Sequence, residues 1–318
     1  MNPANTHRPY GITLGDSSGI GPEILLKAYA ASQLPRPFRV FGDRGVLHYY
    51  NEKLALGVRL NDLDIQDPEL VRASDVEPGR LSSKSGSAAR RYVVDATQAA
   101  LRGEISAVVT LPINKEATQM TDPNFTGHTE LIGALCGAED VTIMLVSDQL
   151  IVTHVSTHVS LKTAIARAKK ERVLKIIELT GAAVSRLRSN PKIAVAGLNP
   201  HAGENGLFGD EEIQEIRPAV EAAKTQGIPV EGPLAPDTLF YLAVQKKKYD
   251  AIVCMYHDQG HIPLKLLDFE GGVNVALGLP IVRTSVDHGT AFDIAGKGIA
   301  STSSLLRAIE LAQQLIRC

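Results

Sequence analysis

Histidine, aspartate and lysine crowd into one short segment, MYHDQGHIPLK, which runs from Met255 to Lys265. The segment directly follows the apolar run Ala251–Cys254, which is typical of a buried strand. In open α/β sheets, ligands bind beyond the carboxyl ends of the strands. The segment is therefore either a polar loop or the place where a strand delivers ligands and a charged group to a cleft.

Three histidines share this setting, because each follows closely on an apolar, strand-like run. They are His158, His201 and His257. Neutral imidazole binds zinc and other divalent ions, and three protein ligands leave coordination positions open for a substrate. A single histidine of this kind is more often structural, and sequence spacing does not prove that the three converge. Together they favour a divalent-metal site, for Zn²⁺, Mg²⁺, Mn²⁺ or Co²⁺.

Further polar side chains suit an anionic, hydroxylated small molecule. Lys265, Asn274 and Arg283 follow the last of these histidines. Arginine offers a rigid fork for carboxylate or phosphate, and lysine can donate charge or act as a base when its pKa falls. His128 and Thr129 begin a predicted helix, where they could bind a phosphate or carboxylate or simply cap the helix.

Other polar groups stay outside the predicted site. Gly15–Glu23 is a glycine-rich turn that could hold an anion, but its spacing matches no nucleotide-binding fingerprint, so we assign no cofactor-binding residues. Asn114 is expected to cap a helix. His154 lies within a strand pattern. His261 follows His257 by four residues and could contact it without binding the metal itself. His288 either contacts a cofactor or caps a helix.

Strand-like runs alternate with amphipathic helical stretches along nearly the whole chain. This alternation predicts an α/β protein with largely parallel sheets and crossover helices. Two adjacent strand-like runs separated only by Ser147-Asp148-Gln149 predict a hairpin, which makes the sheet mixed. The predicted strands are residues 10–14, 38–41, 107–110, 141–146, 150–155, 193–196, 251–255 and 281–284. The predicted helices are residues 22–31, 87–101, 170–187, 211–225, 237–245 and 303–316.

The composition is that of an ordinary globular protein. Of the 318 residues, 44% are hydrophobic and 21% are charged, and the formal net charge is −2, which does not favour a nucleic-acid partner. No apolar stretch reaches the ~18 residues of a membrane helix, and the first residues lack a signal-peptide core. We therefore expect a cytoplasmic protein with neither a nucleic-acid nor a membrane partner.

Long motifs spread over the chain resemble one known family. They are GDSSGIGPEI, LPINKEA, GHTELI, THVSL, GLNPHAGENGLFGDEE, PDTLF, YHDQGHIPLK and GGVNVALGLPIVRTSVDHGTAFDIAGKG, in this order. Together they resemble the 4-hydroxythreonine-4-phosphate dehydrogenase family, although Ser17 and Ser18 stand where that family usually has Pro-Ala. The family fold resembles isocitrate and isopropylmalate dehydrogenases, with two α/β domains flanking a cleft. We expect a first domain of residues 1–125 plus 290–318. A second, of residues 126–289, should carry the dimer interface and most metal and substrate residues.

The resemblance implies a metal-dependent, NAD- or NADP-linked oxidation of a secondary alcohol in a phosphorylated four-carbon acid, followed by loss of carbon dioxide. It also implies a homodimer whose active site lies at the interface, with one metal histidine supplied by the partner. By motif position, the metal ligands would be His158, His201 and His257, and the substrate-binding residues His128, Thr129, Lys265, Asn274 and Arg283. Lys265 and Asp237, the latter from PDTLF, are our candidates for the catalytic step.

The substrate branch stays open. HIPLKLLDFEGGVN resembles the branch that acts on 4-phospho-D-threonate or 4-phospho-D-erythronate, whereas the vitamin B6 branch more often reads LPVLK at this point. A third branch oxidises aromatic dihydrodiols such as terephthalate dihydrodiol. A non-catalytic protein that binds a phosphorylated acid is the alternative outside the enzymes, and the complete set of histidines argues against it.

Overall fold

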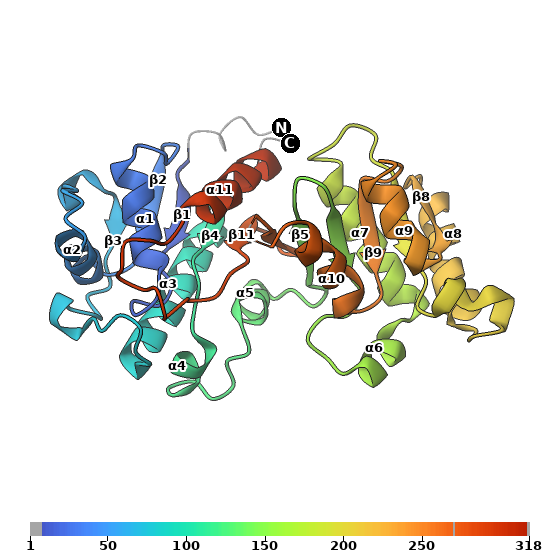
Figure 1. Cartoon of the computed structure of the whole chain (residues 1–318), viewed down its shortest axis with the longest axis horizontal. Coiled ribbons are helices and arrows are strands. Elements are labelled where there is room, and N and C mark those ends of the chain that lie inside the picture. Colours follow the sequence, from blue (N-terminus) through green and yellow to red (C-terminus); the bar gives the residue numbers. More distant parts are fainter. Residues whose placement is uncertain (1–7, 270, 317–318) are drawn as a thin grey trace. The chain divides into compact units, whose positions relative to one another are not determined.

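The computed structural model describes residues 8–269 and 271–316. The chain forms two compact units (Figure 1). The first unit comprises the residues up to Glu139 and from Leu279 onward, and the second unit is Asp140–Gly278. The sequence prediction placed these junctions at 125/126 and 289/290. In the structure His128, Thr129 and Arg283 therefore belong to the first unit, whereas the predicted metal ligands His158, His201 and His257 belong to the second.

The sheet of the first unit is parallel throughout, in the order β3-β2-β1-β4-β11. Its strands are β1 (Tyr10–Thr13), β2 (Phe38–Phe41), β3 (Ile65–Gln66), β4 (Val108–Thr110) and β11 (Arg283–Val286). All but β3 were predicted to within a few residues. The short β3 has no hydrophobic pattern of its own and pairs only at the sheet edge.

Six α-helices belong to the described residues of the first unit. They are α1 (Gly21–Ala30), α2 (Arg44–Lys53), α3 (Ser83–Leu101), α4 (Lys115–Gln119), α5 (His128–Cys136) and α11 (Ser303–Ile316), with 3₁₀ turns at Leu60–Asp62 and Ala73–Asp75. In α11, Leu305, Ala308, Ile309 and Ala312 are buried at the spacing of one helical face. Asn114 caps α4 as predicted, because its side chain accepts a hydrogen bond from the backbone N–H of Ala117 at 2.9 Å.

The glycine-rich turn between β1 and α1 is held by a buried polar network. Asp16 accepts hydrogen bonds from the backbone N–H of Ser18, at 2.8 Å, and from the hydroxyl of Ser85. Ser17 shares a further hydrogen bond with Ser85, with 2.7 Å between the hydroxyl oxygens. Burial raises the pKa of Asp16. The two serines that depart from the family pattern thus fold into the turn itself.

The sheet of the second unit is mixed, in the order β10-β5-β6-β9-β7-β8. Its strands are β5 (Thr142–Val146), β6 (Ile151–His154), β7 (Ile193–Ala196), β8 (Val230–Leu234), β9 (Ala251–Cys254) and β10 (Val273–Leu277). The predicted hairpin is confirmed, because β5 and β6 pair antiparallel. β5 also pairs antiparallel with β10, while β6, β9, β7 and β8 run parallel. Neither β8 nor β10 was predicted.

Helices cover both faces of this sheet. Alternate residues of β7 point to opposite sides: Ile193 and Val195 join a core with α7 and α8, and Ala194 and Ala196 join one with α9 and α10. The helices are α6 (Leu161–Arg167), α7 (Lys170–Val184), α8 (Arg217–Thr225), α9 (Pro236–Val244) and α10 (His257–Leu267), with a 3₁₀-like segment at Pro200–Gly206 and a π-helical turn at Glu212–Ile216.

The segment MYHDQGHIPLK is mostly helix, not loop, since α10 begins at His257. The pattern concealed this helix because Gly260 and Pro263 both lie inside it. Gly260 is required there, since a Cβ at this position would lie 2.5 Å from His154 Nε2. The glycine thus lets α10 approach β6 closely.

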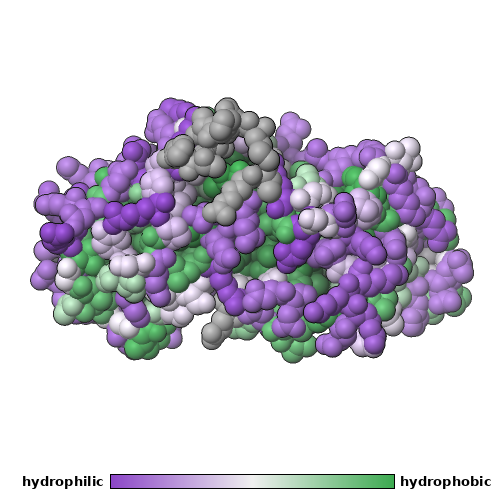
Figure 2. All heavy atoms as spheres, turned by 90° about the horizontal axis from the view of Figure 1, so that it is seen from above, coloured by the Kyte–Doolittle hydropathy of each residue, from purple (hydrophilic) through white to green (hydrophobic). Residues whose placement is uncertain are grey.

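The surface seen in Figure 2 is mostly hydrophilic, with apolar residues scattered among the polar ones. Among the residues that the structure describes, no helix combines the length and the apolar character needed to cross a bilayer.

Candidate functional site

A pocket of about 410 Å³ lies in the second unit, next to the carboxyl ends of β6 and β9. Two chain segments line it, namely residues 157–161, which follow β6, and residues 256–258, which follow β9 and start α10. His158 and His257 both line this pocket. Two of the three predicted metal ligands are therefore brought together, at the sheet edge where the strand ends predicted them.

The geometry of these two histidines fits a shared metal ion. Their ring centres are 5.7 Å apart, with 44° between the ring planes. Two imidazoles bound to one zinc ion at about 2.1 Å have ring centres roughly 5–6 Å apart. His257 Nδ1 lies 2.7 Å from Asp258 Oδ1, so the carboxylate fixes the protonated edge of the ring and leaves Nε2 for a metal.

His201 is placed elsewhere in the second unit. It follows β7 as predicted, and its exposed ring has Nδ1 3.8 Å from Asp237 Oδ2. Within 8–269 and 271–316, no three His, Cys, Asp or Glu side chains cluster closely enough to hold a metal ion. The chain thus brings His158 and His257 together and places His201 separately.

A left-handed turn carries His201. Residues 201–205 all have positive φ, with values of 51° at His201 and 53° at Ala202. Side chains with a Cβ rarely adopt this conformation, so a run of it occurs only where surrounding contacts enforce it. Here the buried carboxylate of Glu212 accepts hydrogen bonds from the backbone N–H groups of Leu198 and Asn199, both at 2.7 Å.

The other predicted residues of the second unit lie on separate elements. Lys265 is on α10, two turns after His257, with its ammonium 5.2 Å from the ring centre of Phe269. Asn274 is a half-buried residue of β10. Asp237 lies in the first turn of α9.

Arg283 is almost fully buried in the first unit, at the start of β11. Its Nη2 donates a hydrogen bond to Thr110 Oγ1 at 2.7 Å. Burial lowers the pKa of Arg283 to about 10, and the charge of Glu130 opposes this shift. The guanidinium therefore stays protonated at neutral pH, and an oxyanion would stabilise this buried charge.

His128 opens α5 in the same unit, with Thr129 next to it. Its Nε2 is buried and makes no hydrogen bond to the described residues. Burial lowers the pKa of His128 well below its usual value, and the positive charges of Arg283 and Lys115 lower it further. A neutral imidazole, two cations and a helix N-terminus form a set of groups that suits a phosphate or carboxylate.

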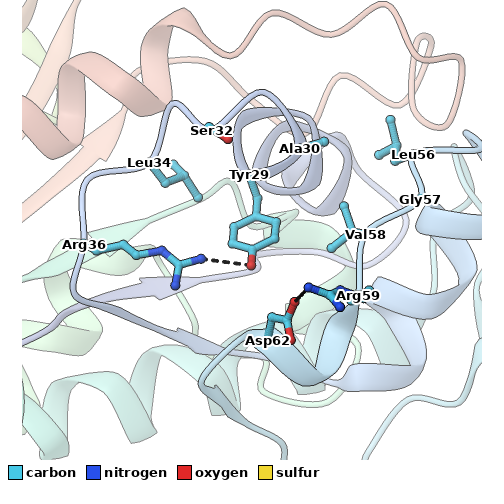
Figure 3. A pocket seen from close by; sticks show the side chains of 10 residues that line it. All are labelled: Tyr29, Ala30, Ser32, Leu34, Arg36, Leu56, Gly57, Val58, Arg59 and Asp62. Carbon is cyan, nitrogen blue, oxygen red and sulfur yellow. Dashed lines mark hydrogen bonds and ion pairs between the residues drawn. The ribbon is translucent and has the colours of Figure 1, made fainter.

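A larger pocket, of about 520 Å³, lies in the first unit beside the end of α1 (Figure 3). Inside it Arg36 Nη2 donates to the Tyr29 hydroxyl at 3.0 Å, and Arg59 pairs with Asp62 at 3.0 Å. Its polar groups thus contact one another, and no predicted site residue lines it. The smaller pocket is the candidate site.

Comparison with known proteins decides the family. Residues 33–312 match the family described as "Pyridoxal phosphate biosynthetic protein PdxA". The chain belongs to the PdxA family. The sequence prediction of this family is therefore confirmed.

Relatives within the PdxA family carry two different names. A protein of Pectobacterium atrosepticum named D-threonate 4-phosphate dehydrogenase is 44% identical over 96% of this chain and 98% of its own. A protein of Geobacter metallireducens named 4-hydroxythreonine-4-phosphate dehydrogenase is also 44% identical, over 98% of this chain and 97% of its own. Overall identity therefore does not separate the two branches.

Solved structures confirm the predicted fold class. The crystal structure of 4-hydroxythreonine-4-phosphate dehydrogenase from Klebsiella pneumoniae is 40% identical, with a TM-score of 0.84 over 97% of this chain and 99% of that one. A β-decarboxylating dehydrogenase from Thermococcus kodakarensis, 15% identical, shares the fold with a TM-score of 0.51 over 97% of this chain and 83% of that one.

Several side chains near the residues described above were left out of the predicted site, including His261, although the sequence suggested that it could support His257. His261 stacks on His257 with 3.6 Å between ring centres and 10° between planes, and its Nδ1 lies 3.2 Å from Nε2 of the buried His154. The spacing of four between His257 and His261 would have placed them on one helical face, had the helix been recognised. Lys115 stands in LPINKEA, where only its neighbour Asn114 was considered. Glu212 gave no signal, because a lone glutamate at a predicted helix start is usually exposed.

Proposed function

We propose that the chain is a divalent-metal-dependent, NAD- or NADP-linked dehydrogenase. Its substrate would be a phosphorylated four-carbon hydroxy acid, either 4-phospho-D-threonate or 4-phospho-D-erythronate, or else 4-hydroxythreonine 4-phosphate. The secondary alcohol is oxidised and the resulting β-keto acid loses carbon dioxide. The observation that supports this most strongly is the pairing of His158 with His257 in one pocket of a PdxA-family protein.

The metal-binding residues would be His158, His257 and the partner's His201. When bound, the ion lowers the pKa of the substrate hydroxyl and polarises the forming carbonyl. Asp258 would orient His257 through Nδ1, and the Asp237 carboxylate lies 3.8 Å from His201 Nδ1. We assign Lys265, with Asp237, to the catalytic step, where Lys265 accepts the hydroxyl proton or stabilises negative charge.

The anionic ends of the substrate would be bound by the remaining predicted residues. In the first unit, Arg283 is a buried permanent cation, and His128 and Thr129 lie at a helix N-terminus. A phosphate there would accept charge-assisted hydrogen bonds from Arg283 and a hydrogen bond from neutral His128. Lys265 and Asn274 are the substrate-binding residues that we assign in the second unit.

A homodimer would complete the metal site. Apolar side chains are exposed on the second unit, including Leu266, which is 85% exposed, and Phe269, which is 75% exposed. Leu161 on α6 and Leu207 and Phe208, just after the His201 turn, are exposed as well. These residues lie on or next to the elements that carry His158, His201 and His257, and burying them between two copies of the chain would remove apolar surface from water. A second copy of this chain is the partner that we propose.

A substrate panel tests this function. The enzyme is stripped with a chelator and reloaded with Mg²⁺, Mn²⁺, Co²⁺ or Zn²⁺. It is then assayed for NAD⁺ and NADP⁺ reduction with the three phosphorylated acids and with terephthalate dihydrodiol. We expect metal-dependent reduction with at least one phosphorylated acid, lost in His257→Ala and kept in the control His48→Ala, which changes an exposed residue of α2. Turnover of the dihydrodiol alone would contradict the proposed substrate class. Tight binding of a phosphorylated acid without turnover would contradict the enzyme.

A further inference from the structure

The turn that carries His201 has the longest run of positive φ among the described residues of the second unit. Four of its residues carry a Cβ and have positive φ, namely His201, Ala202, Glu204 and Asn205, and the turn closes around Gly203 at φ 79°. A left-handed conformation is unfavourable for such residues, and less so for asparagine. A relaxed turn of the same length would be easy to build, so the strain has to be maintained by specific contacts.

Glu212, at the start of the π-helical turn that precedes α8, binds the chain just before this turn and lies close to Gly203 within it. Its side chain is only 1% exposed, and Oε1 accepts from the N–H groups of Leu198 and Asn199 at 2.7 Å each. Its Oε2 accepts from Asn199 Nδ2 at 2.9 Å. A Cβ added at Gly203 would lie 2.7 Å from the same oxygen, so carboxylate and turn are in close contact.

A buried carboxylate with three hydrogen bonds to one loop is more than a helix cap. The groups that it binds are those at the exit of β7, just before the chain turns left-handed at His201. Glu212 is the first residue of a π-helical turn, and such turns are frequent at functional sites. Because backbone in this conformation has few alternatives, the clamp fixes the direction in which the His201 ring leaves the protein.

We infer that Glu212 is a positioning residue for metal binding: its carboxylate clamps the β7 exit and holds the left-handed turn that presents His201 to the metal site. This inference rests on the proposed function, because it takes His201 to be a metal ligand. Glu212 touches neither metal nor substrate and acts through His201 alone. Replacing a residue that contacts and orients a metal ligand typically weakens metal binding about 10–100-fold.

Co²⁺ binding to the dimer tests the inference, followed by calorimetry and by the visible absorption of the bound ion. We expect Glu212→Ala to weaken Co²⁺ binding about 10–100-fold and to change the absorption spectrum. Glu212→Gln keeps one acceptor oxygen for the two backbone N–H groups and should lose less. Glu215→Gln is the matched control, because Glu215 lies on the same π-helical turn but pairs with Lys169 instead of the loop, so it should bind like the wild type.

A double-mutant cycle separates positioning from general destabilisation. If Glu212 acts through His201, then Glu212→Ala added to His201→Ala should weaken Co²⁺ binding no further. An additive loss, or wild-type affinity and spectrum in Glu212→Ala, would overturn the inference. If His201→Ala itself binds Co²⁺ like the wild type, then the proposed metal site fails, which is a different result. Should Glu212→Ala not fold, Glu212→Gln in the same cycle decides.

Discussion

The buried imidazole of His128 lowers the free energy of unfolding as the pH falls. Its pKa is held well below the usual value by burial and by the charges of Arg283 and Lys115. In the unfolded chain the same imidazole titrates near 6.5. The folded state therefore gains stability above this pH, and the gain is lost as pH falls, because only the unfolded state then binds the proton.

The expected size of this effect follows from the unfolded pKa. Between pH 7.5 and 5.5 the unfolded histidine goes from about a tenth to about nine tenths protonated. Because the lowered pKa keeps the folded histidine from taking up the proton to the same extent, the folded state loses stability over this range, by up to about 1.4 kcal/mol. We expect His128→Gln to remove this part of the acid lability. Urea unfolding of the metal- and substrate-free protein, followed by circular dichroism at both pH values, measures it.

The quantity compared between variant and wild type is the change in the free energy of unfolding from one pH to the other, because glutamine also alters packing and hence the stability at any single pH. His48→Gln, at an exposed position of α2, is the control and should lose as much stability on acidification as the wild type. If His128→Gln also loses as much as the wild type, then His128 is not held neutral in the folded state. The anion site described above would then need a different charge assignment.

Three further predictions concern binding, metal support and assembly. Arg283→Lys should lower kcat/KM about 10–100-fold. Lysine cannot reproduce a bidentate contact to an oxyanion, in which each charge-assisted hydrogen bond contributes about 1.5–3 kcal/mol. Unchanged kinetics would show that Arg283 does not bind the substrate. His261→Ala should weaken Co²⁺ binding because the ring that stacks on His257 is lost. His261→Phe keeps an aromatic ring at this position and should retain most of the affinity. Equal losses of affinity in the two variants would exclude stacking as the cause. Leu266→Asp should shift the protein from dimer to monomer in light scattering, while the same change at exposed Leu101 of α3, in the first unit, should not.

Most of the parallel strands and the longer amphipathic helices were predictable because their patterns are periodic and uninterrupted. Ile193–Ala196 and Ser303–Ile316 match the predicted ranges, since each is bounded by turn residues or by a clear change of polarity. β3 was missed because two residues have no period, and α10 was missed because Gly260 and Pro263 usually end helices. Tertiary packing against β6 overrides that local preference, and sequence does not report it.

Some residues of the candidate site were predictable from the sequence and others were not. Positions at strand ends led to His158 and His257, because the carboxyl edge of a sheet gathers such residues whatever the details of the loops. The supporting residues were not predictable in this way. Glu212 and the His154–His261 contact depend on which buried atoms meet, and that is set by backbone conformations such as the left-handed turn at His201.

In the proposed metal site, two imidazoles of one protomer and one of its partner bind a single divalent ion. Anomalous scattering from crystals grown with Co²⁺ tests it most directly. We expect one strong peak per site, within about 2–2.3 Å of a nitrogen of His158, of His257 and of the partner's His201. A peak bound by other side chains, or none at saturating Co²⁺ with His158 and His257 still adjacent, would contradict it.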